Sequence, residues 1–361
     1  MFAPPAIAYQ NGTNWQIELC RDDGLRLCVI DTAGAFQITS VVNNIGNWSL
    51  TLPQGFDKTL IARDRRVKFW RRPASGSMYL EFEGLIRKIT TSADEFGNIT
   101  RIIGGPSLEY LIGGRVIPWT AGNTTATVTA PADNMLKYIA QTNMGTSAAA
   151  TRQLSSTVFS VQSFTSSAPT VTKSFGYRGA LEVMREICDA ARQYGTETYF
   201  NIFPTPPTFE FRTTINQPGA NRTGPTNTII FGTDFDNLKN PRLIEDWTNE
   251  YNYTYALASD QSITTAADAR GQASLFALRE TTVRGVVADA QSKVTGARPA
   301  LTFTGELLSV PRSIYGLDWR FGDRVVITFD GRQFSALVRS VTISVSPQGA
   351  ETITSLVEAY L

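Results

Sequence analysis

The stretch Tyr315–Val345, YGLDWRFGDRVVITFDGRQFSALVRSVTISV, decides the fold class. Hydrophobic residues alternate with their neighbours at Val325, Ile327 and Phe329, and the alternation resumes after Asp330-Gly331. Asp-Gly tolerates the positive φ angles that a tight hairpin turn needs. The stretch therefore predicts a β-hairpin belonging to a small barrel or sandwich.

Length and composition indicate a globular protein of more than one domain. The chain has 361 residues, of which 42% are hydrophobic and 18% charged, and its net charge is +1. A near-neutral chain is a poor general polyanion binder, because displacing counterions needs surplus Lys and Arg. The sequence has no apolar run of roughly 20 residues and no signal-peptide pattern at its start. We therefore expect cytosolic synthesis and no membrane insertion.

The chain contains 0 histidines, which excludes Ser-His-Asp, Cys-His and His-zinc chemistry. A glycosidase with two carboxylates passes this filter, and Glu81, Glu83 and Glu306 are its candidates. All three fall in expected strands, and nothing in the sequence places an acid and a base across a cleft. We nominate no catalytic, cofactor-binding or metal-binding residues and expect no enzymatic activity.

Three cysteines are present. Cys20 and Cys28 flank a turn and are expected to lie opposite each other on a hairpin. A disulfide between them is geometrically possible, but reduced thiols are favoured in a cytosolic product. Cys188 is expected in the core, on a helix face.

Residues 14–52 and 79–103 alternate as antiparallel strands punctuated by Gly, Asn and Asp. Between them, Asp64–Pro73 is the most basic segment of the chain. Basic residues interleaved with aromatics are typical of a nucleic-acid contact. We favour instead a strand with Val67 and Phe69 inward and the charges on a solvated or subunit-facing side.

The middle of the chain has mixed character. Helices are predicted over 133–141 and 179–194, the second ending at Gly195, and strands over 199–203 and 208–211. Residues 145–174 are expected to be loop or irregular β structure. Together they indicate an inserted α+β domain.

From Thr228 the β pattern resumes, with strands at 243–247, 251–257 and 301–310. Asp234, Asp236 and Asn237 lack the further ligands of a calcium loop and are interpreted as a turn. Residues 266–294 have few strand signals, and at least one helix is expected there. Its apolar positions are Ala273, Phe276, Ala277 and Val283. The aromatic positions of 251–257 could stack on sugars, although a packed sheet or subunit interface is favoured. They are Tyr251, Tyr253 and Tyr255.

The sequence contains a weak internal repeat. Residues 82–100 match residues 334–352 at a constant offset of 252, through both a strand and its turn. Upstream, Asp64–Val67 resembles Asp323–Val326. We interpret the match as two related β modules, one near each end of the chain.

These patterns predict a mainly β fold with α+β insertions, built on two related small β-barrels. The first barrel domain spans 1–118, and an inserted α+β domain spans 119–228. The second barrel domain comprises 229–264 and 301–361, and a small, partly helical insertion spans 265–300.

Several short motifs, in order along the chain, resemble the tail hub proteins of long-tailed bacteriophages. They are Gly84–Ile89, Gly104–Leu111, Asn240–Leu243, Tyr315–Asp323 and Ser344–Pro347. The resemblance implies a structural protein of the virion tail tip or baseplate, assembled in the host cytoplasm. In such hubs, two barrel domains per chain form a homotrimeric, pseudo-sixfold ring.

The resemblance also implies partners. They are a distal tail or tail tube protein, a tape measure protein, and tail tip or fibre proteins. DNA is expected to pass through the ring during ejection without specific binding. The remaining alternatives are a carboxylate-dependent peptidoglycan hydrolase and a carbohydrate-binding host-adhesion module.

Overall fold

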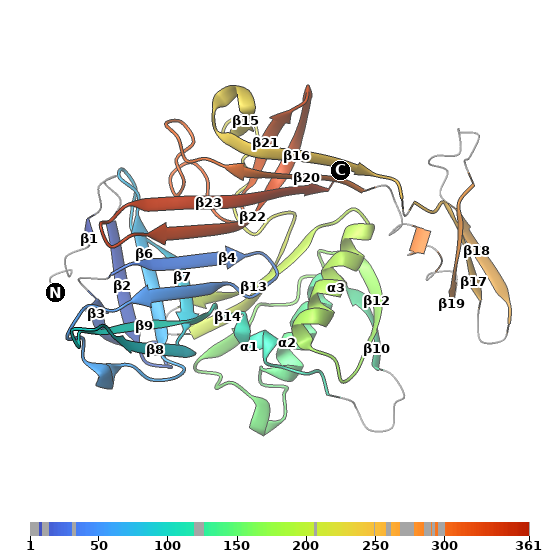
Figure 1. The fold of residues 1–361 in the computed structure, drawn as a ribbon. Coiled ribbons are helices and arrows are strands. Elements are labelled where there is room, and N and C mark those ends of the chain that lie inside the picture. The colour runs from blue at the N-terminus through green and yellow to red at the C-terminus, as the bar shows by residue number, and fades with distance from the viewer. Residues whose placement is uncertain are drawn as a thin grey trace.

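A computed structural model of the chain describes residues 7–8, 14–30, 34–118, 126–205, 208–248, 250–257, 261–267, 278–284, 290, 293–294 and 300–360. Strands dominate these residues, and helices are concentrated in the middle of the chain, which confirms the predicted mainly β class with an α+β part (Figure 1). Within them, no helix has the length and apolar character to cross a bilayer.

One long sheet runs through the molecule in the order β16-β20-β23-β22-β4-β5-β9-β8. Figure 1 shows this order from the top of the view to the bottom, so the two outer strands lie at opposite ends. β21 and β15 branch from β22. The strands are β4 (Phe36–Val41), β5 (Asn47–Thr51), β8 (Lys88–Ala93), β9 (Ile99–Pro106), β15 (Ile230–Gly232), β16 (Leu238–Asp246), β20 (Ala300–Leu307), β21 (Arg324–Phe329), β22 (Arg332–Val345) and β23 (Glu351–Tyr360).

A second sheet, in the order β1-β2-β6-β7 with β3 beside β2, shares a hydrophobic core with the long sheet. Aromatic rings dominate this core: Phe69 lies within 5.6 Å of both Phe36 and Trp48, centroid to centroid. Both sheets are open over the described residues, which form no closed barrel, so the prediction of two closed β-barrels is corrected to two modules built from open sheets. The strands are β1 (Ile7–Ala8), β2 (Asn14–Cys20), β3 (Arg26–Ile30), β6 (Arg66–Arg72) and β7 (Tyr79–Leu85). Short 3-10 helices are η1 (Lys58–Leu60), η2 (Ala150–Arg152) and η3 (Thr233–Phe235).

The predicted hairpin is confirmed. β21 pairs with β22 from Arg324↔Leu337 to Phe329↔Arg332. Both turn residues have positive φ, 50° at Asp330 and 67° at Gly331, as a two-residue turn between twisted strands requires.

The internal repeat is confirmed in the backbone. The turn 94–98 carries the same two hydrogen bonds as the turn 346–350, and Gly97 and Gly349 have φ of 81° and 80°. β7 and β8 together match β22, which has a register irregularity where the first copy is interrupted. Upstream, the predicted match of Asp64 with Asp323 is wrong by one residue. The equivalent of Asp64 is Gly322, since their N–H groups donate to the matching carbonyls of residues 86 and 338.

The α+β part folds around its own core, and both predicted helices are confirmed. α3 ends where Gly195 takes a φ of 79°. The elements are α1 (Tyr110–Gly113), β10 (Ala126–Pro131), α2 (Ala132–Asn143), β11 (Phe159–Val161), β12 (Thr170–Phe175), α3 (Ala180–Gln193), β13 (Thr198–Thr205) and β14 (Thr208–Ile215).

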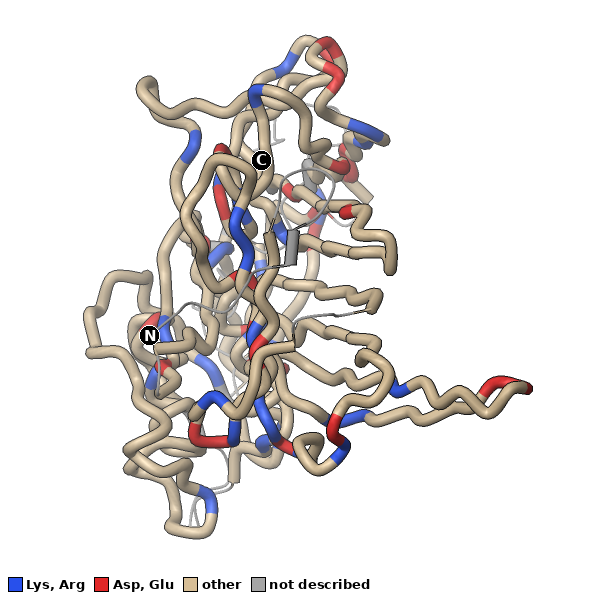
Figure 2. The backbone as a smooth tube through the Cα atoms, turned by 90° about the vertical axis from the view of Figure 1, so that its left-hand side faces the viewer, with Lys and Arg blue, Asp and Glu red and all other residues tan. Residues whose placement is uncertain are grey.

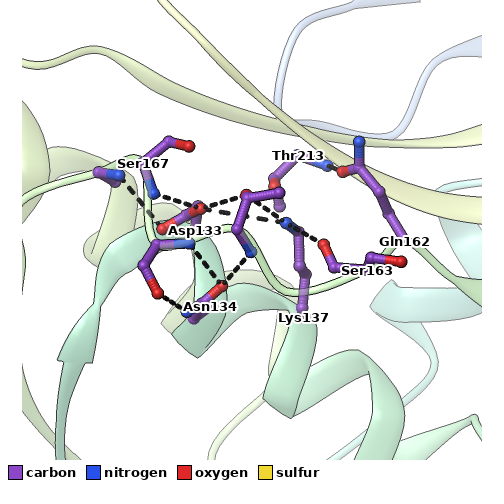
Figure 3. Close-up of polar contacts among 10 residues, drawn as sticks. Asp133, Asn134, Lys137, Gln162, Ser163, Ser167 and Thr213 are labelled. Atoms are coloured by element: carbon purple, nitrogen blue, oxygen red, sulfur yellow. Dashed lines mark hydrogen bonds and ion pairs between the residues drawn. The ribbon is translucent and has the colours of Figure 1, made fainter.

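A buried polar cluster fixes the loop 163–168 onto the start of α2 (Figure 3). Asp133 accepts hydrogen bonds from the Thr165 hydroxyl and from two backbone N–H groups of the loop. The Lys137 Nζ donates to the Ser163 carbonyl at 2.8 Å and to Thr165 Oγ1 at 3.0 Å. Both charged side chains are nearly inaccessible to solvent, so these bonds compensate their desolvation.

A small sheet of β17 (Tyr253–Leu257), β18 (Ile263–Ala267) and β19 (Glu280–Arg284) corrects one prediction. The expected helix within 266–294 is present at Ala290, Lys293 and Val294, which are helical. The expectation is wrong at Val283, which lies on β19 and packs against the core of this sheet. β19 alternates half-buried with exposed residues, and its threonines favour strands. Ala273, Phe276 and Ala277 lie outside the described residues.

Candidate functional site

The basic segment is a strand, β6, whose cations are mostly buried. Val67 and Phe69 point inward as predicted, but the expected solvated position of the charges is wrong. Arg66, Lys68 and Arg71 are 0%, 4% and 2% exposed. Arg66 forms an ion pair with Glu83 on the neighbouring strand. These cations are therefore buried inside the protein and are not accessible to a nucleic acid.

Arg71 joins the two ends of the chain. Its guanidinium contacts both carboxylate oxygens of Glu351, Nη2 at 2.7 Å and Nε at 3.3 Å. Its Nη1 donates to the Tyr315 carbonyl, and Trp15 donates to the same Glu351 carboxylate at 2.9 Å. A charged cluster thus lies where the first β module meets the second.

A cleft of about 520 Å³ beside β7 contains three carboxylates, Glu81, Glu83 and Glu109. Burial raises the pKa of each above its ordinary value, which is a feature of many catalytic acids. Each one nevertheless has a structural partner. Glu81 accepts from the hydroxyls of Tyr79 and Tyr315 at 2.6 Å each.

Glu109 accepts from the Ser107 hydroxyl and from the Ile202 N–H, which ties the first module to the α+β part. Glu306, the remaining glycosidase candidate, lies on β20 and accepts from the Asn240 amide at 3.1 Å. The candidates therefore stabilise the fold where they lie, and Glu306 is not among the residues that line the cleft with Glu81 and Glu83.

The other predicted positions have structural roles. None of the three cysteines forms a disulfide, and Cys28 lies opposite Leu19 rather than Cys20, because the register shifts there. Burial raises the pKa of the Cys20 thiol to about 11, which makes it a poor nucleophile. Asp236 terminates η3 with φ 53°, as the predicted turn requires. No group of three or more His, Cys, Asp or Glu suited to a metal occurs in the part of the chain that the structure describes.

Two of the tyrosines proposed for sugar stacking contact each other instead. Tyr253 and Tyr255 lie on β17, the central strand of the small sheet, with ring centroids 5.1 Å apart and an edge-to-face arrangement. The Tyr255 hydroxyl also donates to Glu280 on β19. This agrees with the favoured interpretation of a packed sheet.

The two ends of the long sheet remain open for pairing. Among the described strands, β8 pairs only with β9, and β16 pairs only with β20. All six residues of β8 are exposed, including Ile89 at 48%. The equivalent of Ile89 in the second module is Val341, which is 2% exposed because β4 and the core cover it. β8 is thus equivalent to the buried part of β22, but among the described strands it has no neighbour in the position that β4 takes beside β22.

Charges are interspersed over the chain, and long stretches of the stacked hairpins carry none (Figure 2). The outward face of the long sheet is rich in hydroxyl and amide side chains. Thr39 and Thr342 hydrogen-bond to each other there at 3.1 Å, across the boundary between the modules. Further members of this face are Gln37, Ser49, Thr90, Ser92, Thr100, Ser344, Thr352 and Thr354.

Comparison with known proteins gives one family match. The family model described as siphovirus ReqiPepy6 Gp37-like protein matches residues 17–356. No curated protein matches the chain.

Solved structures with the same fold span nearly the whole chain. The 43 kDa tail protein of prophage MuSo2 from Shewanella oneidensis has a TM-score of 0.55 and 11% identity, covering 95% of this chain and 98% of its own. Prophage tail protein gp18 from Listeria monocytogenes EGD-e has a TM-score of 0.54 and 12% identity, covering 95% and 94%. The tail protein from Neisseria meningitidis MC58 has a TM-score of 0.51 and 12% identity, covering 96% of each chain.

Proposed function

Since the chain belongs to the siphovirus ReqiPepy6 Gp37-like protein family, we propose that it forms a homotrimeric hub ring of the phage tail tip or baseplate. It is a structural protein of the phage tail, and its location is the virion tail. The proteins that share its fold are themselves tail proteins, which supports this role.

The observation that carries the proposal is the pairing of the two modules inside one chain. β22 of the second module pairs with β4 of the first, from Ser340↔Val41 to Val345↔Phe36. By the internal repeat, β8 is equivalent to β22, and β16 occupies the position of β4. A β8 edge can therefore pair with the β16 edge of the next chain in the same way.

Such a contact joins two different surfaces, so repeating it produces either a closed ring or an open filament. Closure after three chains, each supplying two modules, follows from the hub resemblance. Pairing also covers both edge strands, which would otherwise be open to aggregation.

The internal junction predicts the register between chains. Thr39 and Arg242 are equivalent because they occupy matching positions opposite β5 and β20. Val341 pairs with Ser40 within the chain, so Ile89 should lie opposite Leu243 of the next chain. Leu243 packs partly against the main core, which gives the exposed Ile89 an apolar neighbour.

The outward hydroxyl face supports a channel for DNA. Hydroxyl and amide groups dominate this face and hydrate well, and its exposed cations are few, with Lys88 on β8 and Arg242 on β16. DNA could therefore pass with little retention. We propose that this face lines the ring and that DNA transits the channel without specific binding.

The remaining parts of the proposal concern partners and domains. A distal tail or tail tube protein and a tape measure protein would contact one side of the ring, and tip or fibre proteins the other. We also propose the division into domains 1–118, 119–228, 229–264 with 301–361, and 265–300. The carboxylates hold structural contacts, so we propose no enzymatic activity.

Mass photometry of the purified chain tests the ring, with a particle of three chains expected. Electron microscopy of virions carrying a labelled copy should place the label at the tail tip. A stable monomer that cleaves purified cell wall, or a label on the capsid or side fibres, would refute the proposal.

A further inference from the structure

The junction between the two modules of one chain is built on charge. Glu351 lies at the start of β23, next to the 346–350 turn, and receives Arg71 from β6 and Trp15 from β2. The side chains of Arg71 and Glu351 are only 3% and 2% exposed. Both charges are desolvated and each is satisfied by the other. Replacing only one of the two residues with an apolar residue would therefore leave a buried charge without its partner.

The repeat places different residues at the corresponding positions of the open ends. The equivalent of Glu351, at the offset of 252, is Ile99 at the start of β9. β6 and β21 match at an offset of 258, since Arg66 and Arg324 pair with equivalent leucines, Leu85 and Leu337. At this offset Phe69 is equivalent to Ile327, and both are buried in the core. Arg71 lies two positions after Phe69, so its equivalent is Phe329, two positions after Ile327.

Both open positions are apolar. Ile99 is 47% exposed on β9. Phe329 is half-buried at the end of β21 and contacts Phe303, with ring centroids 5.8 Å apart. Neither side chain has a charge to satisfy, so each can be covered by the other without the desolvation penalty of an ion.

We propose that Ile99 of one chain packs against Phe329 of a second copy, and that this apolar contact distinguishes the junction between chains from the junction within a chain. The inference rests on the proposed ring, in which β8 and β9 of one chain meet the second module of the next. The occupant of this surface is a second copy of the chain, because the surface repeats a junction already present in the structure.

The two chemistries exclude each other. If the β8–β9 hairpin of a neighbour replaced the chain's own β22–β23 hairpin, Ile99 would face Arg71 and leave that cation buried without its carboxylate. In the opposite error, Glu351 would face Phe329 and lose its arginine. Each mismatch buries an unpaired charge, and this energetic penalty disfavours the wrong pairing of modules. The modules therefore alternate around the ring.

Charge substitutions at the open junction test the proposal. Ile99→Glu and Phe329→Arg should each weaken trimer formation by roughly 100-fold or more, because each places a single charge in an apolar contact. The double variant Ile99→Glu/Phe329→Arg should recover most of the affinity by forming the pair found inside the chain. Thr100→Glu, whose side chain points to the opposite face of β9, is the matched control and should remain trimeric.

Mass photometry over a concentration series measures the trimer, and circular dichroism shows whether each variant is folded. Ile99→Glu is the decisive single variant, since an exposed position tolerates the change if no partner covers it. A trimeric wild type with a fully trimeric Ile99→Glu variant, or a double variant no better than either single one, overturns the inference and leaves the ring intact. A monomeric wild type overturns both.

Discussion

Replacing Arg71 with Met should destabilise the junction between the modules by about 3–5 kcal/mol, the typical cost of breaking a buried ion pair by removing one partner. Met retains much of the aliphatic volume but leaves Glu351 with a single remaining donor, Trp15 Nε1, in the contacts described above. The Tyr315 carbonyl loses its bond to Nη1 at 3.1 Å as well.

The assay is urea unfolding at neutral pH, with circular dichroism and tryptophan fluorescence as independent probes and the dependence on urea compared between variants. The double variant Arg71→Met/Glu351→Leu should lose less than Arg71→Met alone, because no buried charge remains unpaired. Arg178→Met is the control, since its pairs with Glu182 and Glu186 on α3 are partly exposed and exposed pairs contribute at most about 1 kcal/mol. A loss at Arg71 no larger than at Arg178 would refute the reasoning.

Three further changes test other parts of the fold. Gly105→Ala should lower the free energy of unfolding more than Gly97→Ala, because a Cβ at position 105 would lie 2.1 Å from a backbone carbonyl oxygen. Position 97 has open space and only a positive φ, which costs about 1 kcal/mol. Equal urea midpoints for the two variants would contradict this. Burial raises the pKa of Glu109 in the folded state, so its contribution to the stability of the fold is present at low pH and is lost as pH rises from about 4.5 through the folded pKa. Glu109→Gln should therefore flatten the decline of stability with pH. Parallel profiles of stability against pH for the variant and the wild type would argue against it. Lys137→Met should cost about 1–3 kcal/mol and make the loop 163–168 more sensitive to protease, while an unchanged digestion pattern would count against the anchoring role.

Local signals in the sequence predicted the elements well. The Asp330-Gly331 turn and the two helices depend on neighbouring residues, and the structure has them where the patterns place them. The family match also confirms the resemblance to a long-tailed phage protein. The repeat was detectable because its turn keeps the same glycine position, at Gly97 and Gly349.

Long-range contacts explain what the sequence did not reveal. Arg71 is expected at the surface of an amphipathic strand, yet its partner is Glu351, 280 positions away along the chain. The short sheet depends on a direct parallel pairing of β17 with β19, although β18 lies between them along the chain. Periodicity alone does not encode such a pairing. The open edges could have been found by comparing the two copies, since Ile89 and Ile99 replace residues that are buried in the second copy.

Cysteine cross-linking across the proposed contact tests the ring most directly. With Ile89→Cys and Leu243→Cys in one chain, oxidation should join β8 of each chain to β16 of the next, and the product should stop at a covalent trimer on a denaturing gel. Each single variant controls for the three native thiols and should give no trimer. Uncross-linked chains, or a ladder that continues beyond three, would contradict the closed homotrimeric ring.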